Sequence, residues 1–186
     1  MKKFELTSET KINIFGKKLF RIKALISFGD VEAGETGGWV EKEGNVNQSG
    51  DAMVYGNAMV SGNAMVSGNA MVYGDAMVYG DAMVYGNAMV SGNAMVSGNA
   101  MVYGNAMVSG DAMVSGDADY TTIHGFGTQF RTTTFFRCKD KKVRVACGCF
   151  FGTIPEFREQ VKNTRKGKIA EEYLMIADLM EKHFEK

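Results

Sequence analysis

Residues 61–74 read SGNAMVSGNAMVYG, and their six-residue pattern, G-[ND]-A-M-V-[YS], runs without a break from Gly50 to Ser115. Looser copies flank this array at residues 44–49 and 116–121. A period of six is not helical, because 3.6 residues per turn would scatter the valines around the axis. It fits a short extended segment followed by a turn, since Gly-Asn and Gly-Asp pairs tolerate positive φ.

Alternation along each extended segment places Ala and Val on one side and Met and Tyr or Ser on the other. Three segments make a triangular coil of 18 residues, and stacked coils make a parallel β-helix. The narrow interior accepts Ala and Val but not Tyr, so we expect the methionines to point outward. The predicted fold is mainly β, with about four coils and a β-helix roughly 20 Å tall.

Residues 18 apart stack, which predicts one column of methionines on each of the three faces. The columns are Met53, Met71, Met89 and Met107; Met59, Met77, Met95 and Met113; and Met65, Met83 and Met101. Tyrosines share this outer surface, with Tyr55 over Tyr73 on one face, Tyr85 over Tyr103 on another and Tyr79 on the third. Together these residues are the candidate interaction surface.

Apolar columns of this length are uncommon on the surface of a monomer. Methionine is adaptable and packs well against aromatic rings, which suits a contact surface. We therefore expect a homo-oligomer, a dimer or trimer in which at least one face is buried against a sister chain. The alternatives are a face that binds a different protein, and a solvated surface left by drift of the repeat.

Three regions are expected: an N-terminal β cap with its connection at 1–49, the β-helix at 50–121 and a C-terminal α+β part at 122–186. The ends of a β-helix are open sheet edges that must be covered. Residues Lys11 to Leu25 alternate as a hairpin with its turn at Gly16-Lys17. Trp39, the single tryptophan, is expected to plug the open end of the first coil.

In the C-terminal part, residues 128–138 and 143–151 are predicted to be two strands of a hairpin. A turn centred on Asp140-Lys141 would pair Cys138 with Val143 and place Cys147 opposite Thr134. One face would then be shared by Cys138, Val143, Val145, Cys147, Cys149 and Phe151, with the cysteines as core thiols rather than metal ligands.

Two helices should follow this hairpin. Thr153 and Glu156 form a capping box with Pro155 in the first turn, which starts a helix that runs to about Asn163. A second helix covers about 169–184 and is expected to pack its apolar stripe on the hairpin.

The formal net charge is zero, but the charges are segregated along the chain. Residues 44–130 contain no Lys or Arg and six acidic residues, whereas residues 131–186 contain 13 basic and eight acidic residues. This basic tail is a candidate phosphate site for a nucleotide or nucleic acid, with a solvated charged turn as the alternative. The candidate residues are Arg131, Arg137, Lys139, Lys141, Lys142, Arg144, Arg165, Lys166 and Lys168.

The chain lacks the residues that several classes of enzyme need for catalysis. An acyltransferase needs a histidine base, and the repeat has none; His124, just past it, is the one candidate, without an identifiable partner acid. A zinc carbonic anhydrase of this fold needs three histidines, and the chain has two. We expect no catalytic residues, metal or cofactor. The polar N-terminal segment and the lack of an apolar run of ~18 residues predict a cytoplasmic protein that does not enter a membrane.

Residues 20–45, FRIKALISFGDVEAGETGGWVEKEGN, and 132–162, TTTFFRCKDKKVRVACGCFFGTIPEFREQVK, flank the array. With these phrases the chain resembles a family of small hexapeptide-repeat proteins that phages and prophages of gut and oral bacteria encode. The resemblance implies a left-handed β-helix and no assigned activity. We therefore expect a non-catalytic phage protein that binds a host component, with interference in host defence as one form. The alternatives are the phosphate binder and the acyltransferase.

Overall fold

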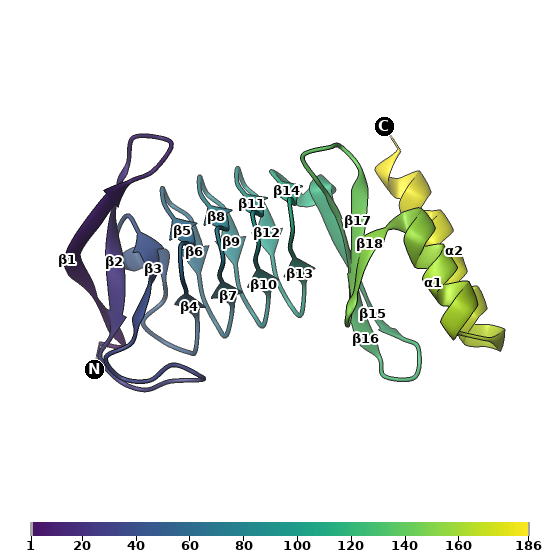
Figure 1. Cartoon of the computed structure of the whole chain (residues 1–186), viewed down its shortest axis with the longest axis horizontal. Coiled ribbons are helices and arrows are strands. Elements are labelled where there is room, and N and C mark those ends of the chain that lie inside the picture. The colour runs from purple at the N-terminus through teal and green to yellow at the C-terminus, as the bar shows by residue number, and fades with distance from the viewer. Residues whose placement is uncertain (1, 186) are drawn as a thin grey trace.

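The computed structural model describes residues 2–185, with the β-helix in the middle, an N-terminal cap at one end and a C-terminal module (residues 120–185) at the other (Figure 1). The β-helix consists of two-residue strands that repeat every six residues. The strands are β4 (Met53–Val54), β5 (Met59–Val60), β6 (Met65–Val66), β7 (Met71–Val72), β8 (Met77–Val78), β9 (Met83–Val84), β10 (Met89–Val90), β11 (Met95–Val96), β12 (Met101–Val102), β13 (Met107–Val108) and β14 (Met113–Val114).

The predicted stacking of residues 18 apart is confirmed. Met59 pairs with Met77 and Val60 with Val78, and the same parallel register holds on the other faces. The alanines and valines of the array are at most 1% exposed, so they fill the interior. We name the three outer surfaces the β4 face (β4, β7, β10, β13), the β5 face (β5, β8, β11, β14) and the β6 face (β6, β9, β12).

The N-terminal cap continues one of these sheets. Strands β1 (Phe4–Ile12), β2 (Lys18–Ala24) and β3 (Thr36–Val40) add to the β5 face and give a seven-stranded sheet. A short 3-10 helix, η1 (Glu43–Asn45), leads from β3 towards the first coil. The predicted hairpin is present, but its first strand begins at Phe4, earlier than expected, and its register is irregular between Leu6 and Thr10.

Trp39 does not plug the first coil, contrary to the prediction. It pairs with Met59, an outward residue, while Val40 pairs with the inward Val60. The indole therefore extends the outer methionine column, where Lys11 Nζ lies 4.5 Å and Arg21 Cζ 5.1 Å from the ring. The end of the interior is filled instead by three residues of the cap that join the buried core, Phe4, Ile22 and Val31.

The C-terminal module is a sheet between the β-helix and two helices (Figure 1). Its strands lie in chain order: β15 (Tyr120–Phe126), β16 (Arg131–Arg137), β17 (Val143–Cys147) and β18 (Phe150–Thr153). A second 3-10 helix, η2 (Asp117–Asp119), precedes β15. Phe136 packs into the end of the β-helix, whereas Phe135 faces α1 (Ile154–Thr164) and α2 (Gly167–Phe184). The capping box of Thr153 and Glu156 is confirmed.

The predicted hairpin register is wrong by one residue. Val143 pairs with Arg137, and Cys147 with Thr133. The loop is longer than the two-residue turn assumed, because Lys141 adopts a φ of 63° and Cys138 N donates to Lys142 O.

This register changes which residues share a face of the sheet. Cys138 and Phe151 lie on the side of the β-helix, whereas Val143 and Cys147 lie on the side of the helices. The segment 143–151 is also two strands rather than one, with a turn at Gly148, where φ is 59°.

Candidate functional site

The β4 face is partly covered at both ends. Met53 is fully buried, which contradicts its predicted place on an accessible surface: the cap lies over it, and a Cβ at Gly37 would be 2.5 Å from Met53 Cε. Tyr73 remains 39% exposed. At the other end Phe150 and Phe151 of β18 help to enclose a cavity of about 130 Å³ against this face.

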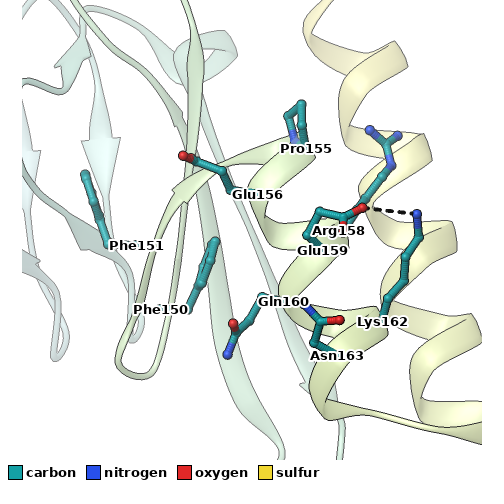
Figure 2. A pocket seen from close by; sticks show the side chains of 9 residues that line it. All are labelled: Phe150, Phe151, Pro155, Glu156, Arg158, Glu159, Gln160, Lys162 and Asn163. Atoms are coloured by element: carbon teal, nitrogen blue, oxygen red, sulfur yellow. Dashed lines mark hydrogen bonds and ion pairs between the residues drawn. The ribbon is translucent and has the colours of Figure 1, made fainter.

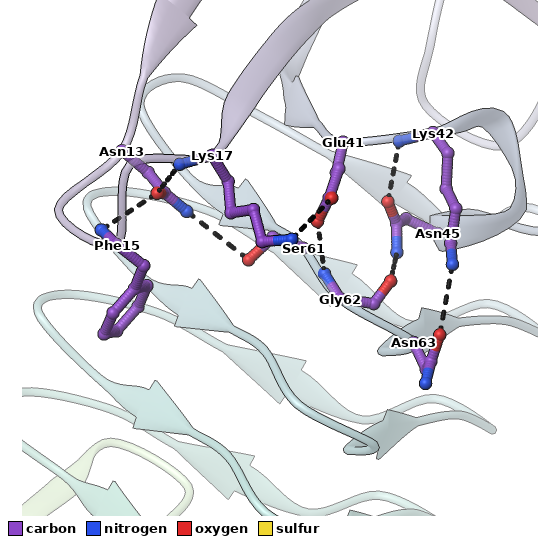
Figure 3. A network of polar contacts seen from close by, with 9 residues as sticks. All are labelled: Asn13, Phe15, Lys17, Glu41, Lys42, Asn45, Ser61, Gly62 and Asn63. Carbon is purple, nitrogen blue, oxygen red and sulfur yellow. Dashed lines mark hydrogen bonds and ion pairs between the residues drawn. The ribbon is translucent and has the colours of Figure 1, made fainter.

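The loop between β1 and β2 covers part of the β5 face (Figure 3). Asn13 Nδ2 donates to Ser61 Oγ at 3.5 Å, and the Phe15 ring lies 4.7 Å from the Tyr79 ring. Lys17 Nζ pairs with Glu41 at 3.4 Å. This contact was not predicted, although apolar residues in a hairpin turn, here Ile14 and Phe15, are a signal that the turn packs on something.

The β6 face keeps its apolar side chains accessible at both ends. Met65 at one end is 38% exposed and Tyr103 at the other is 50% exposed. The Tyr85 and Tyr103 rings stack at 5.4 Å with 14° between their planes, and Tyr103 meets Tyr120 edge-on at 6.5 Å. Burial raises the pKa of Tyr120, whose hydroxyl donates to Met101 O. This tyrosine ladder was predicted for Tyr85 and Tyr103 but not for Tyr120.

The corners between the faces carry ladders of Asn and Asp side chains. Asn57 Nδ2 donates to Asp75 Oδ1 at 3.1 Å, and Asn69 donates to Asn87 in the same way. At each corner, positions 18 residues apart form a column in which no Asp follows another Asp directly. The three columns are Asp51, Asn69, Asn87 and Asn105; Asn57, Asp75, Asn93 and Asp111; and Asn63, Asp81, Asn99 and Asp117. This spacing avoids contact between like charges in neighbouring coils.

The candidate phosphate residues do not form one site. Arg137 lies 3.5 Å from Asp119 and donates to Phe184 O at 2.7 Å, which ties β16 to both neighbouring layers. Arg144 pairs with Asp140 at 2.7 Å. Arg137 therefore links the layers of the module, and Arg144 braces its own hairpin loop; the sequence prediction foresaw neither role.

The other basic residues are dispersed over the module. Lys141 and Lys142 line an open cavity of about 420 Å³ beside Phe184. Lys139 lies at a cavity next to Asp111, and its N–H donates to Asp111 O. Lys166 and Lys168 are exposed where α1 meets α2. Arg131 and Arg165 share a cavity of about 210 Å³.

A groove of about 600 Å³ lies between β18 and α1 (Figure 2). Its charged side chains pair with one another or with α2: Lys162 lies 3.4 Å from Glu159, and Arg158 lies 2.6 Å from Asp178. Phe150 packs towards the helices, and Phe151 towards the β-helix. Because its charges are already paired, this groove does not favour a charged ligand.

The three cysteines are free thiols, and burial raises the pKa of Cys138 to about 11. Within residues 2–185 no three His, Cys, Asp or Glu side chains are grouped to hold a metal ion. His124 is exposed on β15, with its Nδ1 3.1 Å from Thr132 Oγ1. In the described chain, neither helix is long and apolar enough to cross a membrane.

Comparison with known proteins supports the repeat architecture. The model of the YdcK beta solenoid repeat matches the array in overlapping copies, at residues 52–68, 58–74, 65–80, 76–92, 82–98 and 94–110. A search of the curated proteins found no match to the chain. On the repeat match and the structure together, this chain is a repeat protein with a parallel β-solenoid of about four turns.

Proposed function

We propose that the protein is a binding protein that works as a dimer or trimer joined through the β6 face. The observation that carries this proposal is that neither end of the β6 face is covered: Met65 and Tyr103 at its opposite ends are exposed. Each of the other faces keeps one exposed apolar residue, Tyr73 or Met113, but the cap buries Met53 on the β4 face and Phe15 contacts Tyr79 on the β5 face. Methionine beside tyrosine on a flat surface suits packing against a second flat surface.

The chemistry of such a contact is apolar. The array contains no Lys or Arg, so two β6 faces meet through methionines, tyrosines and serines rather than through ion pairs. Salt should therefore leave the oligomer intact. One face measures roughly 20 by 15 Å, about 300 Å², whereas a stable interface needs about 800 Å² per partner. The cap or the C-terminal module therefore has to extend the contact beyond the β-helix.

Native mass spectrometry of the purified chain tests the proposal, since it reports the subunit number and any bound component together. Met83→Glu places a charge at the centre of the β6 face and should give monomers. Met71→Glu makes the same change at a half-buried site on the β4 face and should leave the oligomer intact. A ligand-free monomer of the native chain, or equal effects of the two variants, would refute the proposal.

We further propose that the oligomer engages a host component in the bacterial cytoplasm, with interference in a defence system as its specific form. The support is the resemblance of residues 20–45 and 132–162 to phage-encoded repeat proteins. In a host whose defence restricts a phage, the native chain should restore plating and Met83→Glu should not. Failure of the native chain to restore plating would contradict the defence role. It would not bear on the oligomer, which native mass spectrometry tests separately.

A non-catalytic role is part of this proposal. The acyltransferase alternative depends on His124, which is exposed and lies beside Thr132 on the C-terminal sheet. Incubation with acetyl-CoA and amine or hydroxyl acceptors should give no turnover. A turnover that His124→Ala abolishes would establish the enzyme instead.

A further inference from the structure

The cavity of about 210 Å³ is built from three segments that are distant in the sequence. One wall is the loop after β15, the second is the turn between β17 and β18, and the third is the end of α1 with the side chain of Tyr173 from α2. Its apolar lining is aromatic, from Phe126, Phe150 and Phe157. Its polar lining offers hydrogen-bond donors from Thr128, Gln129 and Gln160.

The charge of this cavity is uncompensated. Of the six arginines in the chain, four pair with carboxylates: Arg21 with Glu9, Arg137 with Asp119, Arg144 with Asp140 and Arg158 with Asp178. Arg131 and Arg165 make no ion pair with any of residues 2–185 that carries a carboxylate. No Asp or Glu lines the cavity that both arginines share. Two positive charges thus face one small space without a partner.

Both arginines border the cavity through defined contacts. Arg131 lies against the turn at Gly148, where φ is 59° and an added Cβ would be 2.3 Å from the guanidinium. Arg165 caps the end of α1, with its N–H bonded to Val161 O at 2.8 Å and its Nη1 to Thr164 O at 3.3 Å. Both side chains are exposed, so a ligand can reach the two guanidinium groups.

The hydroxyl of Tyr173 lies at the same cavity as the guanidinium groups of Arg131 and Arg165. It donates to Phe126 O at 3.1 Å and lies against Gly127. Burial raises the pKa of Tyr173, and the guanidinium groups of Arg165 and Arg131 both act in the opposite direction. Both positive charges therefore act on the Tyr173 hydroxyl inside the cavity.

We propose that this cavity binds a small phosphate monoester, with Arg131 and Arg165 holding the phosphate and the phenylalanines contacting the organic part. Guanidinium groups match the oxygens of a phosphate in a fork geometry, and a dianion neutralises both charges. The volume equals that of roughly seven water molecules, so a nucleic-acid strand does not fit. This site is independent of the β6 face.

Titration of the full-length, ¹⁵N-labelled chain with inorganic phosphate and with phenyl phosphate at pH 7.5 tests this assignment. Amide shifts should be confined to residues 126–131, 147–150 and 160–165, and phenol should produce none. The double variant Arg131→Gln, Arg165→Gln should weaken phosphate binding by at least about tenfold. The control double variant, Lys141→Gln with Lys142→Gln, removes the same charge elsewhere on the module and should bind within about twofold of the native chain.

Three results would overturn the proposal: no shifts at millimolar phosphate, equal loss in both double variants, or dimethyl phosphate binding as tightly as phenyl phosphate. Equal loss would indicate a diffuse positive field, and the third result a diester site. Thermal melting establishes that each variant is folded. Should the double variant not fold, Arg165→Gln alone, at an exposed helix end, must still weaken binding. Native mass spectrometry of the same variants separates this site from the oligomer, which both should retain.

Discussion

The first coil of the β-helix presents mainly carbonyl oxygens at its open end, whereas the last coil presents mainly N–H groups. The cause is the polarity of most of the ladder: N–H groups of the Asn or Asp, Met and Tyr or Ser positions donate to carbonyls one coil further on, as from Met53 to Ala70 O at 3.1 Å. The methionine carbonyls are the exception, and in the last coil Met101 O accepts from the Tyr120 hydroxyl. The N-terminal cap must therefore supply mainly donors, and the C-terminal module mainly acceptors.

Four side chains, two at each end, follow this rule. At the first coil, Lys3 Nζ donates to Gly50 O and Ala52 O at 3.0 and 2.7 Å, and Asn45 Nδ2 donates to two further carbonyls. At the last coil, Thr134 Oγ1 accepts from Met107 N at 3.0 Å, and Asp117 accepts from another N–H group. A polar group buried without a partner is costly, so reversing a donor or an acceptor should destabilise the end concerned.

Asn45→Asp gives the largest expected effect, because it turns a buried donor into an acceptor. The new carboxylate keeps the bond from Lys42 N but faces Gly62 O and Ala64 O, which now lie 3.2 and 2.8 Å from the amide nitrogen. We expect a loss of about 3 kcal/mol in the free energy of unfolding, measured by denaturant titration.

Asn47→Asp is the matched control for this variant. Asn47 is exposed, and its oxygen already accepts from Ser49 N at 2.8 Å. The substitution Asn47→Asp should therefore change the free energy of unfolding little. Equal losses for the two substitutions would mean that general acidity, rather than the reversed donor, weakens the cap.

Lys3 provides a pH-dependent test of the donor end. Its side chain is 2% exposed, and burial lowers its pKa from 10.5 to about 8, although Asp51 acts to raise it. Between these values the unfolded chain holds the proton and the folded chain has released it, so stability should rise with pH. A neutral amine still has two N–H groups for the two carbonyls. We expect a gain of roughly 2 kcal/mol between pH 8 and 10.

Thermal melting from pH 7 to 10 measures this gain as the difference between the native chain and Lys3→Met, which should lack it. Lys2→Met removes an exposed lysine paired with Glu43 and should keep it. A Lys3→Met profile parallel to that of the native chain would show that other groups govern the dependence.

Thr134→Val tests the acceptor end with a smaller change. Valine has nearly the same shape as threonine but cannot accept the hydrogen bond from Met107 N. Thr134, the present acceptor, is fully buried. The expected loss is about 1–2 kcal/mol, seen as a lower midpoint of thermal unfolding. Thr132→Val, two residues earlier on β16, replaces a hydroxyl next to exposed His124 and should cost much less. A loss at Thr132 as large as at Thr134 would argue against the acceptor rule.

The sequence was sufficient to predict the β-helix but not its ends, for a physical reason. Within the array the orientation of Val60 or Met77 follows from its own place in the hexad, because the neighbouring coils repeat the same environment. The place of Trp39 depends on pairing with Met59, and the cover on Tyr79 on contact with the distant Phe15. Contacts of this kind, between the cap and the β-helix, produce no periodic pattern in the sequence.

The basic site illustrates the same limit. The charge of the C-terminal tail was evident from the sequence, but its division into paired and unpaired arginines was not. Arg137 pairs with Asp119, 18 residues earlier, whereas Arg131 and Arg165 meet at one cavity through the fold of the module. One residue in the loop at Lys141 also shifted the register of β16 and β17.

The smallest predicted effect lies between the two ends, where the Asn and Asp ladder runs with the polarity of the backbone. Asn93 Nδ2 donates to Asp111 Oδ1 at 3.3 Å, with Asp75 one coil before it. Asn93→Asp would stack three carboxylates and should cost about 0.5–1 kcal/mol, less in 1 M salt. Asn105→Asp, in the last coil, would still accept from Asn87 Nδ2 and should be neutral. If Asn105→Asp costs as much as Asn93→Asp, the ladder has no polarity, and an acceptor is no better placed at the last coil than in the middle.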